Sequence, residues 1–330
     1  MTRISASAPG KVVVAGEYAV LDGAPAVAMA VDRRAVVTMQ PAAGSTHTLT
    51  APGYLDGRWR FEWTDGNLRW LDEPPAAGSM HLLECVFAEC AWDPAGPADV
   101  TIDSRTLHDP ASAQKLGFGS SAAVAVSLTA ACRFGSGASD AVDDAAERAH
   151  RRFQGNRGSG VDIAAALSGG VIRFTRNASP EHLAWPEGLH YRLYWSGRPA
   201  STRAKIERSP NTEEGSLRAA ADAVASVWER GDTEEILSTM SAFTDALQAF
   251  DAATGTGVFA AGHAELCRAG KDVPGLVYKP CGAGGGDVGI AVASDREAVE
   301  SFDALARASG FTVLDASMDP RGVQASAEAT

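Results

Sequence analysis

A glycine- and serine-rich turn that runs directly into an apolar segment, KLGFGSSAAVAVSLTAA (residues 115–131), constrains the fold more than any other stretch. The alanine, valine and leucine residues after it predict that a helix begins at the serines. The first backbone N–H groups of a helix have no intrahelical partner, and the aligned peptide dipoles place about half a positive charge there. Because glycine lets an anion approach the backbone closely, the stretch is suited to binding phosphate.

A capped helix start without a ligand is the alternative interpretation, because serine is a good N-cap in any protein. The common nucleotide motifs fit poorly, since neither a Walker A loop nor G-x-G-x-x-G is present here. Two further glycine clusters, GNRGSGVD (residues 155–162) and KPCGAGGGDVG (residues 279–289), favour a ligand. Glycine costs about 1 kcal/mol of backbone entropy relative to alanine, and close contact with a bound molecule would offset that cost.

The composition of the 330 residues, 45% hydrophobic and 21% charged, is that of a packed globular protein long enough for two domains. The net charge of −12 argues against nucleic-acid or anionic-membrane partners, so an anionic substrate requires local cations. No apolar stretch is long enough for a membrane helix, and MTRISASAPG lacks the apolar core of a signal peptide, so we expect a cytoplasmic protein. The five cysteines form no C-x-x-C pair, which predicts reduced, mostly buried thiols.

Strand-like and helix-like segments alternate in both halves of the chain, which predicts an α+β fold. Helices are expected over residues 79–92, 120–131, 138–153, 217–230, 233–250, 258–270 and 296–309. Trp59, Trp63 and Trp70 are expected to pack within a hairpin. The loosened segment TRNASPEHLAWPEG suggests a boundary near residue 180, giving an N-terminal domain of residues 1–180 and a C-terminal domain of residues 181–330.

Three stretches, taken together and in this order, resemble the motifs of the GHMP kinase family. They are SAPGKVVVAGEYAVLD (residues 7–22), KLGFGSSAA (residues 115–123) and GAGGGD (residues 282–287). The resemblance implies an ATP- and Mg²⁺-dependent phosphotransferase. It also implies an N-terminal domain with a left-handed β-α-β unit, a ferredoxin-like C-terminal domain, ATP along the second motif and an acceptor in the cleft between the domains.

Within the family, the stretches QGNRGSGVDIAAA, WSGRPAST and CGAGGGDVGIA, together with Tyr18 in the first motif, are most similar to the phosphomevalonate kinase branch. This similarity implies phosphorylation of 5-phosphomevalonate, a small anionic substrate, to 5-diphosphomevalonate by a monomer or homodimer. Mevalonate kinase is the main alternative. The GAGGGD loop argues against a third possibility, a diphosphomevalonate decarboxylase. The presence of Lys11, Ser121 and Asp162 together argues against a non-catalytic sensor.

The family motifs imply roles for individual residues, and Lys11 and Asp162 match the catalytic positions. The nucleotide-binding positions are Lys115, Gly117, Gly119, Ser120, Ser121 and Ala122, with Ser121 also the Mg²⁺ ligand. The acceptor-binding positions are Tyr18, Arg157, Ser159, Gly160, Ser201, Thr202, Lys205, Gly282, Ala283, Gly284, Gly285 and Asp287, with Arg198 and Arg203 as further cations. Lys279 is expected near the nucleotide, and His150 stands at or near the place of a metal-binding glutamate of mevalonate kinases.

The role of Asp162 depends on the acceptor. An alcohol must lose a proton to a base, whereas a phosphate monoester, with a second pKa of about 6, is already ionised at neutral pH. For a phosphorylated acceptor we therefore expect Asp162 mainly to orient Lys11 and the metal.

Overall fold

The computed structural model describes residues 2–76, 78, 80–136, 142–156, 158–199 and 215–328. The helices are α1 (His81–Glu89), α2 (Ser120–Ser136), α3 (Val142–Phe153), α4 (Val161–Ser168), α6 (Gly215–Arg230), α7 (Thr233–Thr254), α8 (His263–Gly270) and α9 (Arg296–Ala308), with 3-10 turns η1 (Ala19–Asp22) and η2 (Arg105–Leu107). The strands are β1 (Arg3–Ala15), β2 (Ala26–Pro41), β3 (His47–Ala51), β4 (Leu55–Thr64), β5 (Asn67–Trp70), β6 (Ala98–Asp103), β7 (Val171–Phe174), β8 (Glu181–Leu183), β9 (His190–Trp195), β10 (Leu276–Pro280), β11 (Val288–Ala293), β12 (Thr312–Leu314) and β13 (Gln324–Glu328).

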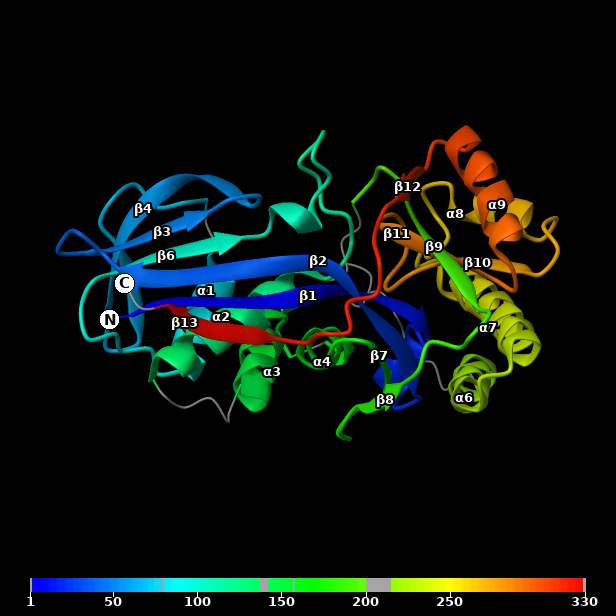
Figure 1. Ribbon diagram of the computed structural model, residues 1–330, viewed down its shortest axis with the longest axis horizontal. Helices are drawn as coiled ribbons and strands as arrows, with labels where there is room; N and C mark the ends of the chain where they lie inside the picture. The colour runs from blue at the N-terminus through cyan, green and yellow to red at the C-terminus, as the bar shows by residue number, and fades with distance from the viewer. Residues whose placement is uncertain are drawn as a thin grey trace.

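The larger sheet is built around the long antiparallel pair β1 and β2 (Figure 1). Its order is β13-β1-β2-β6-β3-β4-β5, with β7 joined to β2 and β8 to β7. Helices α2 and α4 pack on β1 and β2. The first half of β1 alternates between buried and less buried residues, whereas from Ala8 onward every residue is buried. This continuous burial explains the unbroken valine run Val12 to Val14, because a strand covered on both faces needs no polar side.

The smaller sheet has the order β10-β11-β9-β12, and all of its pairings are antiparallel. In chain order the strands are β9, β10, β11 and β12, with helices inserted after β9 and between β11 and β12. This is the β-α-β-β-α-β arrangement of a ferredoxin-like unit with extra helices, as expected from the family resemblance. The amphipathic helix α9 packs against β9, β11 and β12.

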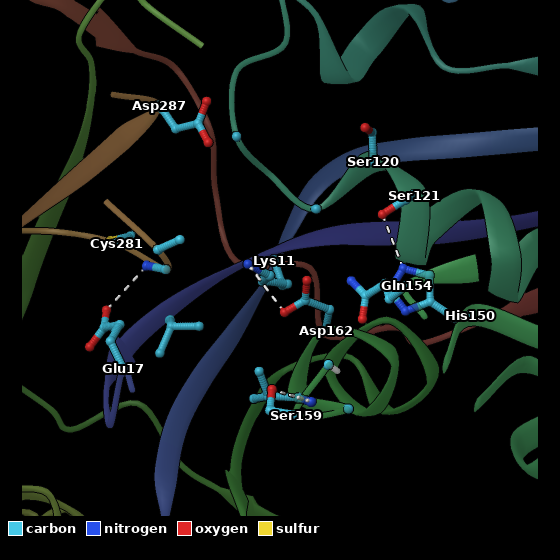
Figure 2. Close-up of a pocket in the computed structure, with 18 of the residues that line it drawn as sticks. Lys11, Glu17, Ser120, Ser121, His150, Gln154, Ser159, Asp162, Cys281 and Asp287 are labelled. Carbon is cyan, nitrogen blue, oxygen red and sulfur yellow. Dashed lines mark hydrogen bonds and ion pairs between the residues drawn. The ribbon is translucent and has the colours of Figure 1, made fainter. Parts of the chain in front are cut away.

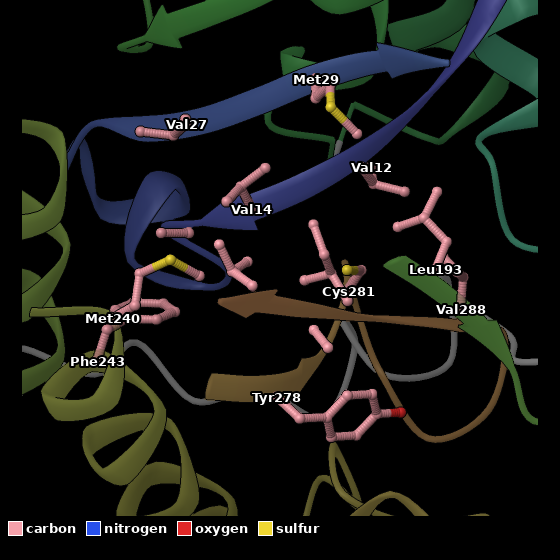
Figure 3. Close-up of a cluster of buried hydrophobic side chains, with 14 of the residues drawn as sticks. Val12, Val14, Val27, Met29, Leu193, Met240, Phe243, Tyr278, Cys281 and Val288 are labelled. Atoms are coloured by element: carbon pink, nitrogen blue, oxygen red, sulfur yellow. The ribbon is translucent and has the colours of Figure 1, made fainter. Parts of the chain in front are cut away.

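A continuous apolar core joins the two sheets (Figure 3). Val12 and Met29 of the larger sheet belong to the same cluster as Leu193 and Val288 of the smaller sheet and Phe243 of α7. Because this contact fixes the end of β1 against the smaller sheet, loops from both sheets are held close together at one place. That place is where the candidate active site lies.

Strand pairing crosses residue 180 in two places, since β8 pairs with β7 and β13 pairs with β1. Figure 1 shows the C-terminal segment running back from β12 along β1, so that both ends of the chain lie at the same end of the molecule. The division into residues 1–180 and 181–330 stays a prediction. Strand β13 was not predicted from the sequence, because its residues, QASAE, include no β-branched or aromatic side chain.

The structure agrees with several local expectations. The three tryptophans lie on the β4–β5 hairpin, where Trp63 and Trp70 contact Phe87 and Phe61. All five cysteines are free and buried. Helix α3 covers the later part of the predicted helix 138–153, and residues 138–141 lie outside the described residues. In the described part of the chain, no helix combines the length and apolarity needed to span a membrane.

Candidate active site

A cavity of about 620 Å³ lies between loops that belong to both sheets (Figure 2). Most of the predicted site residues line it: Lys11, Tyr18, Lys115, Gly117, Gly119, Ser120, Ser121, Ser159, Gly160, Asp162, Gly282, Ala283 and Asp287. Ala122, Gly284 and Gly285 do not belong to its lining. Arg157, Ser201, Thr202, Arg203 and Lys205 lie outside the described residues.

The second motif forms a turn into α2, as the sequence predicts. Gly117 and Gly119 both adopt positive φ angles, 94° and 71°, and α2 begins at Ser120. The N–H groups of Ala122 and Ala123 already donate to the carbonyl of Gly119. Within the described residues the N–H groups of Ser120 and Ser121 have no backbone or side-chain acceptor, so they remain for an anion in the cavity.

Gly117 also has a packing reason to be glycine. A Cβ atom at this position would lie 2.3 Å from the Cβ of Asp287, which is closer than side-chain carbons can approach. The missing side chain therefore lets the second and third motifs meet. Ala122 is buried inside α2 and supports the helix without reaching the cavity.

Lys11 and Asp162 form an ion pair at the centre of the cavity, with 3.4 Å between Nζ and Oδ1. Lys11 comes from β1, and only 9% of its side chain is exposed, whereas Asp162 lies in the first turn of α4 and is 27% exposed. The backbone N–H of Lys11 donates to the carbonyl of Phe118 at 2.8 Å. This bond ties the first motif to the second, so the ammonium group lies beside the start of α2.

His150, on α3, lies beside Ser121, and 3.0 Å separates Nε2 from the hydroxyl oxygen Oγ. Burial lowers the pKa of His150 to about 4, with the nearby Asp162 carboxylate opposing that shift. The imidazole is therefore neutral at pH 7. A neutral imidazole at this position adds no negative charge for a metal ion, in contrast to a glutamate.

The donor set suits a magnesium ion that arrives with a nucleotide. Among the described residues no group of three or more histidine, cysteine or acidic side chains could hold a metal. Mg²⁺ keeps several waters and is commonly bound through one or two protein oxygens plus substrate phosphates. The Ser121 hydroxyl and the Asp162 carboxylate both line the cavity and could provide these one or two protein oxygens.

The third motif is a closed turn whose amides are largely engaged by the protein. The N–H of Gly285 donates to the carbonyl of Val258 at 2.6 Å, and that of Gly284 donates to Cys281 at 3.3 Å. A Cβ on Gly284 would lie 2.4 Å from the Val258 carbonyl oxygen. Gly284 and Gly285 therefore pack the loop against its neighbour, and Gly282, Ala283 and Asp287 are the residues of this motif that face the cavity.

Two hydroxyl groups that were expected to bind the acceptor, those of Tyr18 and Ser159, already form hydrogen bonds within the protein. The Tyr18 hydroxyl donates to the carbonyl of Ala283 at 2.7 Å, and the Ser159 hydroxyl accepts the N–H of Val161 at 3.3 Å. Lys279, expected beside the nucleotide, does not line the cavity, because it is fully buried in an ion pair with Glu17. That expectation was wrong.

Sequence reasoning assigned no role to four further residues that line the cavity: Glu17, His81, Phe153 and Gln154. His150, which it placed at or near a metal-binding position, lines the cavity as well. His150, Phe153 and Gln154 follow the i, i+3, i+4 spacing of one helix face, so the pattern was present in the sequence. It gave no indication of whether that face meets a core or a cavity.

Comparison with known proteins agrees with this geometry. Residues 81–170 match the family model described as the GHMP kinases N terminal domain. The phosphomevalonate kinase of Streptomyces sp. strain CL190 is 31% identical over 335 residues, covering 86% of this chain and 88% of that protein. A mevalonate kinase of Methanothermobacter thermautotrophicus is 30% identical over 173 residues, or 52% of this chain and 50% of that protein.

A solved structure of Streptococcus pneumoniae phosphomevalonate kinase in complex with phosphomevalonate and AMPPNP has a similar fold, with a TM-score of 0.78. It shares 16% identity, and the match covers 95% of this chain and 99% of that chain. The chain belongs to the GHMP kinase family, which confirms the resemblance drawn from the three motifs and the α+β fold class. It is accordingly a phosphotransferase, and kinases of this family use ATP.

Proposed function

We propose that this enzyme transfers the γ-phosphoryl group of ATP to 5-phosphomevalonate, giving 5-diphosphomevalonate in the mevalonate route to isoprenoids. The observation that carries the proposal is the Lys11–Asp162 pair, which lies beside the start of α2 in a single cavity. The choice of acceptor is supported by the four stretches that resemble phosphomevalonate kinases and by the relative of that name, which is 31% identical over 86% of the chain. Mevalonate kinases also match, at 30% identity over 52% of the chain and at 28% identity over 96% of it, so the assay below has to distinguish the two acceptors.

In this proposal the residues of the cavity bind, orient and neutralise charge, which is the protein's main work in phosphoryl transfer. The N–H groups of Ser120 and Ser121 bind phosphate oxygens, with Lys115, Gly117 and Gly119 beside them. ATP supplies the phosphoryl group, and the Mg²⁺ that accompanies it neutralises phosphate charge, with Ser121 as its protein ligand. Lys11 stabilises the negative charge that develops on the transferred group.

Asp162 orients the Lys11 ammonium and, through it, the reacting phosphate. No base is required for a phosphorylated acceptor, since a phosphate monoester has a second pKa of about 6. The acceptor lies between Ser159 and Gly160 on one side and the third motif, to which Tyr18 is hydrogen-bonded, on the other. The proposal also includes ligands of the acceptor phosphate that lie outside the described residues: Arg157, Ser201, Thr202 and Lys205.

A coupled assay of ADP release tests the function, with mevalonate and 5-phosphomevalonate offered separately. We expect turnover with 5-phosphomevalonate alone. Turnover with mevalonate alone would identify a mevalonate kinase, and release of carbon dioxide from diphosphomevalonate would identify a decarboxylase. No turnover with any of these compounds would favour an unrelated acceptor or a sensor on the same fold. Gel filtration with light scattering tests the expected monomer or homodimer.

A further inference from the structure

An ion pair that the chemistry above does not use lies at the wall of the cavity, where Glu17 belongs to the lining and its partner Lys279 does not. Lys279, on β10, bonds to the Oε1 atom of Glu17, which follows β1, and their side chains are 0% and 1% exposed. Removing two charges from water costs several kcal/mol per ion, so a buried pair contributes little net stability compared with apolar side chains. The pair therefore calls for a role other than stability.

Glu17 connects the pair to the third motif. The same Oε1 atom that binds Lys279 also accepts the backbone N–H of Gly282 at 3.2 Å (Figure 2). The next residue, Tyr18, donates its hydroxyl to the carbonyl of Ala283 at 2.7 Å. Glu17 thus holds the N–H group of Gly282, and Tyr18 holds the carbonyl group of Ala283.

Lys279 favours the ionised form of Glu17, which is a stronger hydrogen-bond acceptor than a neutral carboxyl group. Burial raises the pKa of Glu17, and the neighbouring Lys279 ammonium opposes that rise. The ammonium also donates to the carbonyl of Val13 at 3.5 Å, although Lys279 itself does not belong to the cavity lining.

The loop that Glu17 holds adjoins the catalytic ammonium. A Cβ atom on Gly282 would lie 3.8 Å from the Nζ atom of Lys11, and both Gly282 and Ala283 line the cavity. We propose that Glu17 is a positioning residue for phosphoryl transfer. Held by Lys279, it fixes the N–H of Gly282 and so places the third motif against Lys11. The kinetic part of this inference rests on the function proposed above.

A matched pair of double variants separates positioning from stability. Glu17→Gln with Lys279→Met removes both charges but keeps a carbonyl oxygen that can accept the Gly282 N–H. Glu17→Met with Lys279→Met removes the charges and the acceptor. Because neither variant leaves a buried charge unpaired, both are expected to fold, which thermal melting checks.

We expect the kcat of Glu17→Gln/Lys279→Met to exceed that of Glu17→Met/Lys279→Met by at least about tenfold. The KM for ATP should differ between the two by less than about threefold, because the start of α2 holds the nucleotide. If the pair serves only to stabilise the fold, the two variants will have equal kcat values, and that result would overturn the proposal.

Amide exchange tests the same contact without any substrate. Cys281–Gly282 is the only Cys-Gly peptide in the sequence, so labelling cysteine carbonyls with ¹³C and glycine nitrogens with ¹⁵N yields one assignable signal. We expect the Gly282 N–H to exchange at least about tenfold faster in Glu17→Met/Lys279→Met than in Glu17→Gln/Lys279→Met. Equal exchange rates would overturn the proposed role of Glu17. Because this experiment uses no substrate, its result does not depend on whether the acceptor is 5-phosphomevalonate.

Discussion

Gly119→Ala tests whether the position of the Lys11 ammonium controls the reaction. Gly119 has a φ angle of +71°, and a Cβ atom there would lie 3.0 Å from the Cε atom of Lys11 and 3.7 Å from Oδ2 of Asp162. The backbone strain of a left-handed alanine costs about 1–2 kcal/mol. The tight contact also requires the lysine side chain to shift by a few tenths of an ångström, which disturbs its 3.4 Å contact with Asp162.

We expect this displacement to lower kcat by roughly threefold to tenfold, since a misplacement of about 1 Å can cost about 100-fold and the shift here is a few tenths of that. The assay is ADP release at saturating ATP and acceptor, together with a thermal melt. Gly255→Ala is the matched control, because Gly255 has a φ angle of +64° at the end of α7 and no atom lies within 4 Å of the added carbon. The control should lose similar stability and keep its kcat. Equal kcat values in the two variants would refute the reasoning.

Three further predictions concern the charged centre. Lys11→Met should lower kcat by roughly 10²- to 10³-fold with little change in the KM for ATP, measured by ADP release. Asp162→Asn should cost less, roughly tenfold, with 5-phosphomevalonate; a loss as large as that of Lys11→Met would instead indicate general-base catalysis. In the nucleotide-free protein, His150 binds a proton near pH 6.5 when unfolded but only near pH 4 when folded. Its contribution to the free energy of unfolding is thus complete above pH 6.5 and falls by roughly 3 kcal/mol as the pH drops below 4. Urea titrations at pH 7 and 4.5 should show a smaller difference for His150→Gln than for the unchanged protein, and an identical difference would contradict the buried, neutral histidine.

Short sequence patterns predicted much of the site, because its shape depends on backbone conformations that a few neighbouring residues determine. The turn from Gly117 to Ser120 is encoded by residues that adopt positive φ angles and begin a helix, and the structure has both features there. Lys11 and Asp162 were found through the motifs that surround them, and they meet in one cavity. The family was likewise recognisable from three short stretches, because each of them needs glycine or a particular side chain at fixed spacing.

In the third motif, the sequence did not show whether a glycine is needed for close packing within the protein or for close approach of a ligand. Gly284 adjoins the carbonyl of Val258, whereas Gly282 faces the cavity, and the sequence GAGGGD shows no difference between them. Close packing against protein and close approach of a ligand both require a residue without a side chain. Which of the two applies to Gly284 depends on the position of Val258, more than twenty positions earlier in the chain.

By itself the sequence determined the secondary structure that follows from local periodicity, the glycine-rich turn at the start of α2, and membership of the kinase family. Only the tertiary structure decided which charged groups line the cavity. Lys279 precedes a glycine loop as a nucleotide-binding lysine would, yet it is buried against Glu17, 262 positions away in the chain. The physical reason is that the environment of a charge is set by the atoms packed around it, and those atoms come from segments that folding alone brings together.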